Sequence, residues 1–429
     1  MNKSQHSTAT RLAYADEAGV LHLEANATSW LRSLPGVNIG VLAIVGPMRT
    51  GKSSLLNDLL GSDACFRTSA ALSSCTKGLW ARAVPAPSWL PALDGGTLLL
   101  LDTEGLGSPD APSRDPQLFA LACILSSVVA YNSFGLVEEI SVARLARLCS
   151  VAARVLSATG GSSSGDLAPR LLWLLRDFNH ALTDEFGGPI TADSYLESAL
   201  APPGSDGQSD SLAAPSAGAA NALARDVLRA CFPSRRCCTL PRPMSDRLLA
   251  EHAGLPPESR TREWLTACEE LKTTLGRDLA PKRLGSGALD GPSLAELLTR
   301  AVNLLADPST LPADPHAILG RGLLAAQAER ARNLAVAAYS LAVSEELPEQ
   351  GRLPYGRRAI DTVHRCAKLA SLRVFMDVAP FGSRGGGNGG GGGDQEEGAI
   401  LEAARGLSDW APAREELKRL RALLIQRDA

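Results

Sequence analysis

The chain has 429 residues, of which 45% are hydrophobic, so it can bury a sizeable core and form about two or three domains. A formal net charge of −3 excludes a strongly basic surface, and we therefore expect no nucleic-acid partner. Nine cysteines without a C-x-x-C pair are typical of reduced thiols, which indicates a cytoplasmic protein rather than a secreted, disulfide-bonded one.

No segment of the sequence predicts an integral membrane span. The most apolar window, Leu118 to Tyr131, covers about 14 residues and contains two serines, which favours a buried helix. The first ten residues lack an apolar signal core, and no cysteine lies four residues from the end of the chain. We therefore expect neither a secretory leader nor a prenyl anchor.

Short β-prone runs alternate with helical patterns between about residues 39 and 240. This alternation predicts an α/β fold with a mostly parallel sheet and helices on both faces. In chain order, the expected strands are Ile39–Val45, Leu79–Val84, Thr97–Leu101, Leu171–Leu175 and Cys237–Leu240. Three of them run directly into polar or charged residues, at the edge where open α/β sheets bind ligands.

The first of these strands leads into a phosphate-binding loop. Residues 46–53, Gly-Pro-Met-Arg-Thr-Gly-Lys-Ser, match G-x-x-x-x-G-K-S, and a helical pattern over Ser54–Leu60 follows. In such a loop the backbone N–H groups surround phosphate oxygens at a helix N-terminus. Lys52 is expected to reach the β and γ phosphates, and Ser53 to offer its hydroxyl to Mg²⁺.

Two further elements are expected near the phosphates. The apolar run Thr97–Leu101 ends in Asp102-Thr103-Glu104-Gly105, about 50 residues after Lys52; in nucleotide hydrolases such an aspartate holds Mg²⁺ through water and the glycine N–H contacts the γ phosphate. Thr76 precedes the β-prone run at residue 79. It is a candidate second Mg²⁺ ligand when the γ phosphate is present.

The base is expected to be guanine. Many small GTP-binding proteins recognise it with N-K-x-D, but the single Asn-Lys pair, Asn2-Lys3, lacks both the preceding strand and the aspartate. The run Leu171–Leu175 instead ends in Arg176-Asp177, which places a carboxylate at the sheet edge. A carboxylate accepts hydrogen bonds from guanine N1–H and the 2-amino group, whereas adenine offers it a ring acceptor and leaves it unpaired.

The remainder of the chain predicts a short all-α domain. Helical patterns cover Ala317–Leu347, Arg357–Val378 and Glu415–Ile425, while Pro202–Ala220 and the glycine run at residues 385–393 are typical of loops or linkers. The expected organisation is a nucleotide-binding domain over residues 1–311, the start of a helical domain over 312–384, a glycine-rich linker over 385–398 and a terminal helix over 399–429.

Together, these motifs resemble the guanylate-binding protein family, large GTPases of the dynamin group. The resemblance rests on the phosphate loop with Arg49-Thr50 inside it, and on residues 75–80, 102–107 and 175–178. It is supported by Phe119–Ala122, Leu125–Ser127, Tyr131–Ser133, Thr191–Glu197, Phe232-Pro233 and Arg242-Pro243, and it extends from about Leu12 to about Val378. The related atlastins differ inside the loop and carry transmembrane segments.

The resemblance implies a role for each matching residue. Nucleotide contacts are implied for Gly46, Arg49, Thr50, Gly51, Lys52, Ser53, Ser54, Gly105, Arg176, Asp177 and Arg242, and Mg²⁺ contacts for Ser53, Thr76 and Asp102. Catalytic roles are implied for Arg49 as an arginine finger supplied in cis, Ser74 for orienting the attacking water, Thr76 as the switch threonine and Glu104 in the second switch.

The resemblance further implies a homodimer formed face to face across the nucleotide, beneath a cap that carries Arg242. Two departures stand out. Asp246 occupies a place where another basic residue is expected, and family members have a long helical stalk where this sequence ends soon after its glycine run.

Three functions remain open from the residues. The first is a GTPase that binds GTP with Mg²⁺, releases GDP and changes its assembly as it does so. The second is a non-catalytic scaffold that dimerises with GTP and recruits partners, and the third is an ATPase with an unusual base site. A degenerate site usually loses its lysine or its Mg²⁺ ligand, and both are present, which favours the enzyme.

Overall fold

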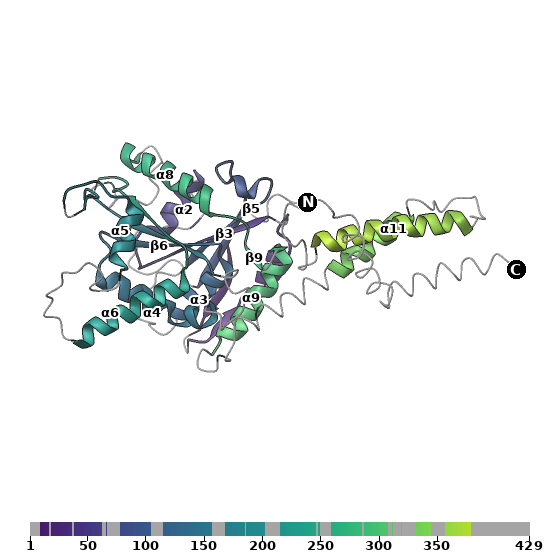
Figure 1. Cartoon of the computed structure of the whole chain (residues 1–429), viewed down its shortest axis with the longest axis horizontal. Helices are drawn as coiled ribbons and strands as arrows, with labels where there is room; N and C mark the ends of the chain where they lie inside the picture. Colours follow the sequence, from purple (N-terminus) through teal and green to yellow (C-terminus); the bar gives the residue numbers. More distant parts are fainter. Residues whose placement is uncertain are drawn as a thin grey trace, which may run out of the picture. The chain divides into compact units, whose positions relative to one another are not determined.

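The computed structural model describes residues 9–16, 19–36, 38–61, 66, 78–103, 115–156, 168–184, 186–201, 215–245, 248, 259–284, 287–307, 311, 319, 331–344 and 357–378. The described residues divide into two compact units (Figure 1). One falls within residues 1–284 and 288–321, the other within residues 285–287 and 322–429. The domain boundary expected at residues 311 and 312 stays a prediction.

The first unit is built around an eight-stranded sheet. Its strands are β1 (Thr10–Ala15), β2 (Leu21–Leu23), β3 (Ile39–Val45), β4 (Leu79–Pro85), β5 (Thr97–Thr103), β6 (Val128–Phe134), β7 (Arg170–Arg176) and β8 (Arg235–Leu240). They lie in the order β2-β1-β4-β5-β3-β6-β7-β8. Strands β5, β3, β6, β7 and β8 run parallel, whereas β4, β1 and β2 join by antiparallel pairing, so the predicted mostly parallel α/β sheet is confirmed.

Helices cover both faces of this sheet. They are α1 (Ala27–Arg32), α2 (Lys52–Leu60), α3 (Asp115–Leu125), α4 (Glu139–Leu156), α5 (Ala192–Ala199), α6 (Pro215–Cys231), α8 (Arg262–Asp278) and α9 (Gly291–Leu305), with a short 3-10 turn η1 (Pro91–Leu93) and a small ladder of β9 (Arg283–Leu284) and β10 (Gly287–Ala288). Figure 1 shows α2 and α8 on one face, and α3, α4, α6 and α9 on the other.

The alternation of side chains along the strands divides the core between these faces. Leu42 and Ile44 of β3 pack with the α2 and α8 side, in a cluster that includes Leu55, Leu271 and Leu275. The intervening residues of β3 point to the opposite face and are just as buried. A strand that is covered on both faces has a continuous apolar sequence, and this is why β3 could be predicted with its observed bounds.

Two expectations about the helices need correction. The apolar window Leu118–Tyr131 is not one buried helix: α3 ends at Leu125 and β6 begins at Val128. Both elements are almost fully buried, so apolar residues are continuous through both. The sequence therefore shows neither the 3.6-residue period of a helix nor the two-residue period of a strand. The loop expected at Pro202–Ala220 is shorter, because α6 begins at Pro215.

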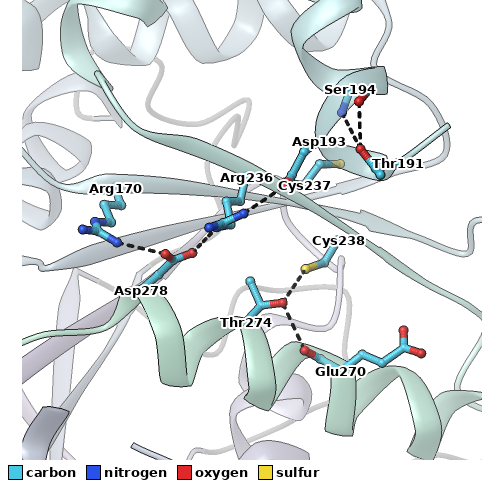
Figure 2. Close-up of polar contacts among 10 residues, drawn as sticks. All are labelled: Arg170, Thr191, Asp193, Ser194, Arg236, Cys237, Cys238, Glu270, Thr274 and Asp278. Carbon is cyan, nitrogen blue, oxygen red and sulfur yellow. Dashed lines mark hydrogen bonds and ion pairs between the residues drawn. The ribbon is translucent and has the colours of Figure 1, made fainter. Parts of the chain in front are cut away.

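Charged contacts fix α8 and α5 to the start of the last two strands (Figure 2). Asp278, the last residue of α8, accepts hydrogen bonds from Arg170 Nη1 at 2.9 Å and from Arg236 Nε at 2.6 Å. Asp193 of α5 accepts from Arg236 Nη1 at 3.0 Å and from the backbone N–H of Cys237 at 2.7 Å. The latter bond occupies a backbone amide on the outer edge of β8.

The second unit is helical over residues 331–344 and 357–378. Residues 331–344 form one helix, and α11 (Arg357–Val378) has the bounds expected from the sequence. The Tyr339 hydroxyl lies 2.8 Å from His364 Nδ1, so the two helices contact each other. The glycine-rich linker at residues 385–398 and the terminal helix at 399–429, with Glu415–Ile425, lie outside the described residues. Among the helices that the structure does describe, none combines the length and hydropathy needed to cross a bilayer.

Candidate functional site

The phosphate loop joins the central strand β3 to helix α2 at the carboxyl edge of the sheet. Every residue of β3 is buried, and α2 begins at Lys52 directly after the loop. The first N–H groups of α2 therefore point into the loop, where the helix dipole favours an anion. This is the strand-loop-helix arrangement that the sequence predicts for residues 46–53.

The loop backbone requires glycine at both ends. Gly46 has φ 148°, and a Cβ there would lie 2.2 Å from the carbonyl oxygen of Asn132. Gly51, the residue before α2, has φ 74°. Arg49 also adopts a left-handed conformation, with φ 62°, and is exposed at the top of the loop. A non-glycine residue in this conformation carries backbone strain, which is common at ligand sites.

Asn132 of β6 holds the phosphate loop by a hydrogen bond to its backbone. Its side chain is fully buried, and Nδ2 donates to the carbonyl oxygen of Thr50 at 2.7 Å. Thr50 is buried in turn and donates its hydroxyl to the Pro47 carbonyl at 3.0 Å. The sequence marks Asn132 only as part of a family-like stretch, because the contact that gives it a role is 82 positions away.

Lys52 lies inside the loop, with its ammonium group bonded to loop carbonyls. Nζ donates to the carbonyl oxygens of Gly46 at 3.1 Å and Pro47 at 3.0 Å. Burial lowers the pKa of Lys52, and the negative charge of Asp102 opposes this effect. The group thus lies at the centre of the loop, where a phosphate oxygen would compete with the two carbonyls.

Ser53 and Asp102 meet beside this lysine. Ser53 Oγ donates to Asp102 Oδ2 at 2.6 Å. Burial raises the pKa of Asp102 to about 6, against the opposing effects of the Ser53 hydrogen bond and the Lys52 charge. The other carboxylate oxygen, Oδ1, is buried and has no hydrogen-bond partner among the residues that the structure describes. A hydroxyl beside a carboxylate with an unused oxygen fits Mg²⁺, a hard cation that takes oxygen ligands.

Asp177 and Arg242 come together at the ends of β7 and β8. Arg242 Nε lies 3.7 Å from Asp177 Oδ2, and the two side chains are 51% and 33% exposed. Asp177 has φ 53°, which turns the chain sharply after β7. The Phe178 N–H donates to the Leu240 carbonyl at 3.2 Å and holds this turn against β8. The predicted base-recognising carboxylate is therefore presented at the open edge of the sheet.

Arg176 points away from its neighbour Asp177. It is only 4% exposed and lies beneath the phosphate loop, so that a Cβ at Gly51 would lie 3.4 Å from its Nη2. Its guanidinium carbon stands 4.6 Å from the ring centre of Trp264. Burial lowers the pKa of Arg176 to about 10, with the charges of Asp177 and Asp58 opposing. The sequence predicts that Arg176 and Asp177 both contact the base. In the structure, the Arg176 side chain lies near Gly51 and Trp264, whereas the Asp177 side chain lies near Arg242.

Several predicted site residues lie outside the described residues. They are Ser74, Thr76, Glu104 and Gly105, and Asp246, the departure from the family pattern, also lies outside them. Ser54, in the first turn of α2, is half-buried. Asp58, Arg260 and Trp264 were not predicted from the sequence. Arg260 and Trp264 each donate a hydrogen bond to Asp58 behind the loop, and both donors lie more than 200 positions from Asp58 in the sequence.

Comparison with known proteins identifies the same region of the chain. The family model described as guanylate-binding protein, N-terminal domain, matches residues 19–276. Guanylate-binding protein 7 of Mus musculus is 33% identical over 351 residues, which cover 79% of this chain and 52% of that protein. Guanylate-binding protein 2 of Homo sapiens is 32% identical over 349 residues, which cover 78% and 56%. The chain spans about half the length of the curated relatives it matches. With the phosphate loop, its buried lysine and the Ser53–Asp102 pair in the matched range, the chain belongs to the guanylate-binding protein family.

Proposed function

We propose that this chain binds GTP with Mg²⁺ and hydrolyses it to GDP. The observation that best supports the proposal is the grouping of Lys52, Ser53 and Asp102 at the N-terminus of α2. Three groups suited to a phosphate and its metal converge where the backbone N–H groups of the loop point. Family membership over residues 19–276 supports the same reading.

In this proposal, each group of the loop has a separate task. Lys52 exchanges its two carbonyl partners for β and γ phosphate oxygens. Ser53 and Asp102 are the residues that would hold Mg²⁺ beside the phosphates, through their side-chain oxygens. The metal supplies positive charge that offsets the charge on the transferring phosphoryl group. On the resemblance, Thr76 and Gly105 complete the metal and γ-phosphate contacts, Ser74 orients the attacking water and Glu104 belongs to the second switch.

Exposed apolar side chains support a homodimer through the same face. Phe134 at the end of β6, Ile140 in the first turn of α4 and Phe186 in the loop after β7 are 51%, 70% and 88% exposed. Phe134 ends β6, Ile140 lies in the helix that follows β6, and the segment with Phe186 follows β7, so all three come after the carboxyl ends of parallel strands. Aromatic residues are enriched in interface cores, and we propose that a second copy of the chain covers them.

Turnover of GTP and ATP by the purified chain tests the proposal. We expect Mg²⁺-dependent release of phosphate from GTP, with turnover of ATP at least 100-fold slower, because a site built to pair with a donor rejects a base lacking it by a large factor. Measurement of molecular mass in the same samples distinguishes the GTPase from the non-catalytic scaffold. The scaffold would form a dimer with GTP and release no phosphate. Equal turnover of ATP would instead favour the unusual ATPase.

Asp177→Asn is expected to weaken GTP binding by about 2 kcal/mol, because the amide strands one guanine donor and loses the charge that strengthens both bonds. The same change should improve binding of xanthosine triphosphate, whose 2-oxo group accepts a bond from the new amide. Titration of both nucleotides by calorimetry checks this reversal. Arg242→Gln is the comparison variant: it removes the partner of Asp177 and leaves the carboxylate in place, so it is expected to keep the preference for GTP over xanthosine triphosphate even if its overall affinity falls. Unchanged preference for GTP in Asp177→Asn would contradict the base assignment.

A further inference from the structure

A buried cluster of four side chains lies behind the phosphate loop. It consists of Asp58 in α2, Arg176 at the end of β7, Arg260 just before α8, and Trp264 in the first turn of α8. Arg260 Nη2 and Nε donate to Asp58 Oδ1 at 3.0 Å and Oδ2 at 3.1 Å, and Trp264 Nε1 donates to Oδ2 at 3.1 Å. Arg176 stacks over the Trp264 ring. We name these residues the arginine–tryptophan cluster.

The cluster contacts the chain next to both parts of the nucleotide site. The Arg176 guanidinium packs against Gly51, the last loop residue before Lys52. The backbone of Arg176 continues directly into Asp177, the residue that presents a carboxylate at the base position. Asp58 lies in the helix that begins at Lys52. The same four side chains therefore support the phosphate loop, its helix and the base-recognising turn.

The cluster retains a cation at a position where its burial is unfavourable. Arg176 Nε and Nη1 are both buried, and within the described part of the chain neither has a hydrogen-bond partner. The guanidinium is held instead by the face of Trp264 and by the charges of Asp58 and Asp177. A buried charge without full hydrogen bonding destabilises a fold, and a leucine or methionine would fill such a place at a lower cost. The retention of a planar cation at this cost points to a role in the neighbouring nucleotide site.

We propose that Arg176, held by Trp264, is a positioning residue that fixes the backbone of Gly51 and the orientation of Asp177 at the same time. Phosphate affinity and selectivity for guanine then depend on one shared support. Arg176 does not contact the base through its side chain in this assignment. The proposal deepens the proposed GTP-binding function and rests on it, because it assigns the support of that same site.

The test compares three variants with a matched control. Trp264→Leu removes the ring and the bond to Asp58, Trp264→Phe keeps a ring and removes only the bond, and Arg176→Lys keeps the charge without the planar group. Leu275→Ala is the control: it creates a cavity in the same buried face of α8, about three turns further along the helix. Each protein is titrated with GTP, GDP and inosine triphosphate, which lacks the 2-amino group of guanine.

Trp264→Leu and Arg176→Lys are expected to weaken GTP and GDP binding about tenfold, the scale of a desolvated cation–π contact, and to reduce the preference for GTP over inosine triphosphate. Trp264→Phe should fall between them and the wild type. Leu275→Ala should lower the melting temperature to a similar degree and change affinity by less than about twofold, since additivity holds for distant sites. Equal affinity and selectivity in Trp264→Leu and Leu275→Ala would overturn the proposal.

Hydrogen exchange without nucleotide separates this proposal from the function on which it rests. Trp264→Leu is expected to speed exchange of the backbone amides at residues 49–53, and Leu275→Ala to leave them at the wild-type rate. Unchanged exchange in Trp264→Leu would refute the support of the loop even if GTP binding is confirmed. A wild-type chain that binds no guanine nucleotide would refute the proposed function, while faster loop exchange in Trp264→Leu would still establish the contact with Gly51.

Discussion

Arg49→Ala is expected to lower GTP turnover about 100-fold or more while GTP affinity changes by only a few-fold, which is the pattern for an arginine that acts in the transition state. Arg49 is exposed on the phosphate loop, and its backbone is left-handed, with φ 62°. Ground-state binding is left to the loop amides and Lys52. Single-turnover rates and equilibrium titrations on the same protein samples give the two quantities separately.

Two further variants separate the guanidinium from the backbone that carries it. Arg49→Gly suits the φ of 62° and also removes the side chain, so it should lose as much turnover as Arg49→Ala. Arg49→Lys keeps the positive charge without the planar fork and should recover only part of the rate. If a second copy of the chain orders Arg49, wild-type turnover per molecule should rise with protein concentration. Equal specific activity of wild type and Arg49→Gly at high concentration would refute the arginine finger.

Lys52→Met is expected to abolish GTP binding at concentrations that saturate the wild type, since it removes the ammonium group from the centre of the loop. The melting temperature of the nucleotide-free protein should not fall. Burial lowers the pKa of Lys52, which means that the fold disfavours the charged form that binds phosphate. Removing that charge relieves the penalty and offsets the loss of the hydrogen bonds to the Gly46 and Pro47 carbonyls, so GTP affinity should be lost with little change in stability.

Lys282 provides the matched control for this prediction. It is also a buried lysine whose Nζ donates to a backbone carbonyl, that of Ser126 at 2.7 Å, just past the end of α3. Lys282→Met should leave GTP affinity unchanged and reduce the free energy of unfolding by about 1 to 3 kcal/mol, because the carbonyl loses its buried partner. Calorimetric titration and thermal unfolding of both variants check the pair. Retention of GTP affinity by Lys52→Met would contradict the loop assignment.

The central part of the fold could be predicted from the sequence because its strands are covered on both faces. β3 and β5 are fully buried; β3 has no polar side chain, and β5 has an apolar run over Leu98–Leu101 before its polar end at Asp102 and Thr103. β1 could not be predicted in this way: it is half-buried near the sheet edge, and its sequence, Thr-Arg-Leu-Ala-Tyr-Ala, has no clear alternation. β6 was missed for the opposite reason, since it follows the buried helix α3 with only Ser126 and Ser127 between them.

The candidate site shows the same difference between local and distant information. Lys52 and Ser53 belong to one short motif with a fixed geometry, and in the structure they begin α2 directly after the loop, while their contacts to phosphate and Mg²⁺ stay predictions. The supports of that motif are tertiary contacts. Trp264 donates a hydrogen bond to Asp58, which lies 206 positions earlier in the sequence, and no local sequence pattern indicates such a partner. For Arg176, the sequence indicates that it follows a buried strand, but the direction of its side chain depends on the helix that packs behind it.

The two ends of the sheet affect how copies of this domain can associate. β2, the strand at one end, is only three residues long. At the other end, the Cys237 amide on the outer edge of β8 is already bonded to Asp193. An exposed strand edge is a template on which another chain can add a strand and start an aggregate or fibre. Short length at one end and a side-chain hydrogen bond at the other both hinder such growth. The proposed dimer through the loops at the carboxyl edge would therefore have less competition from open-ended polymers.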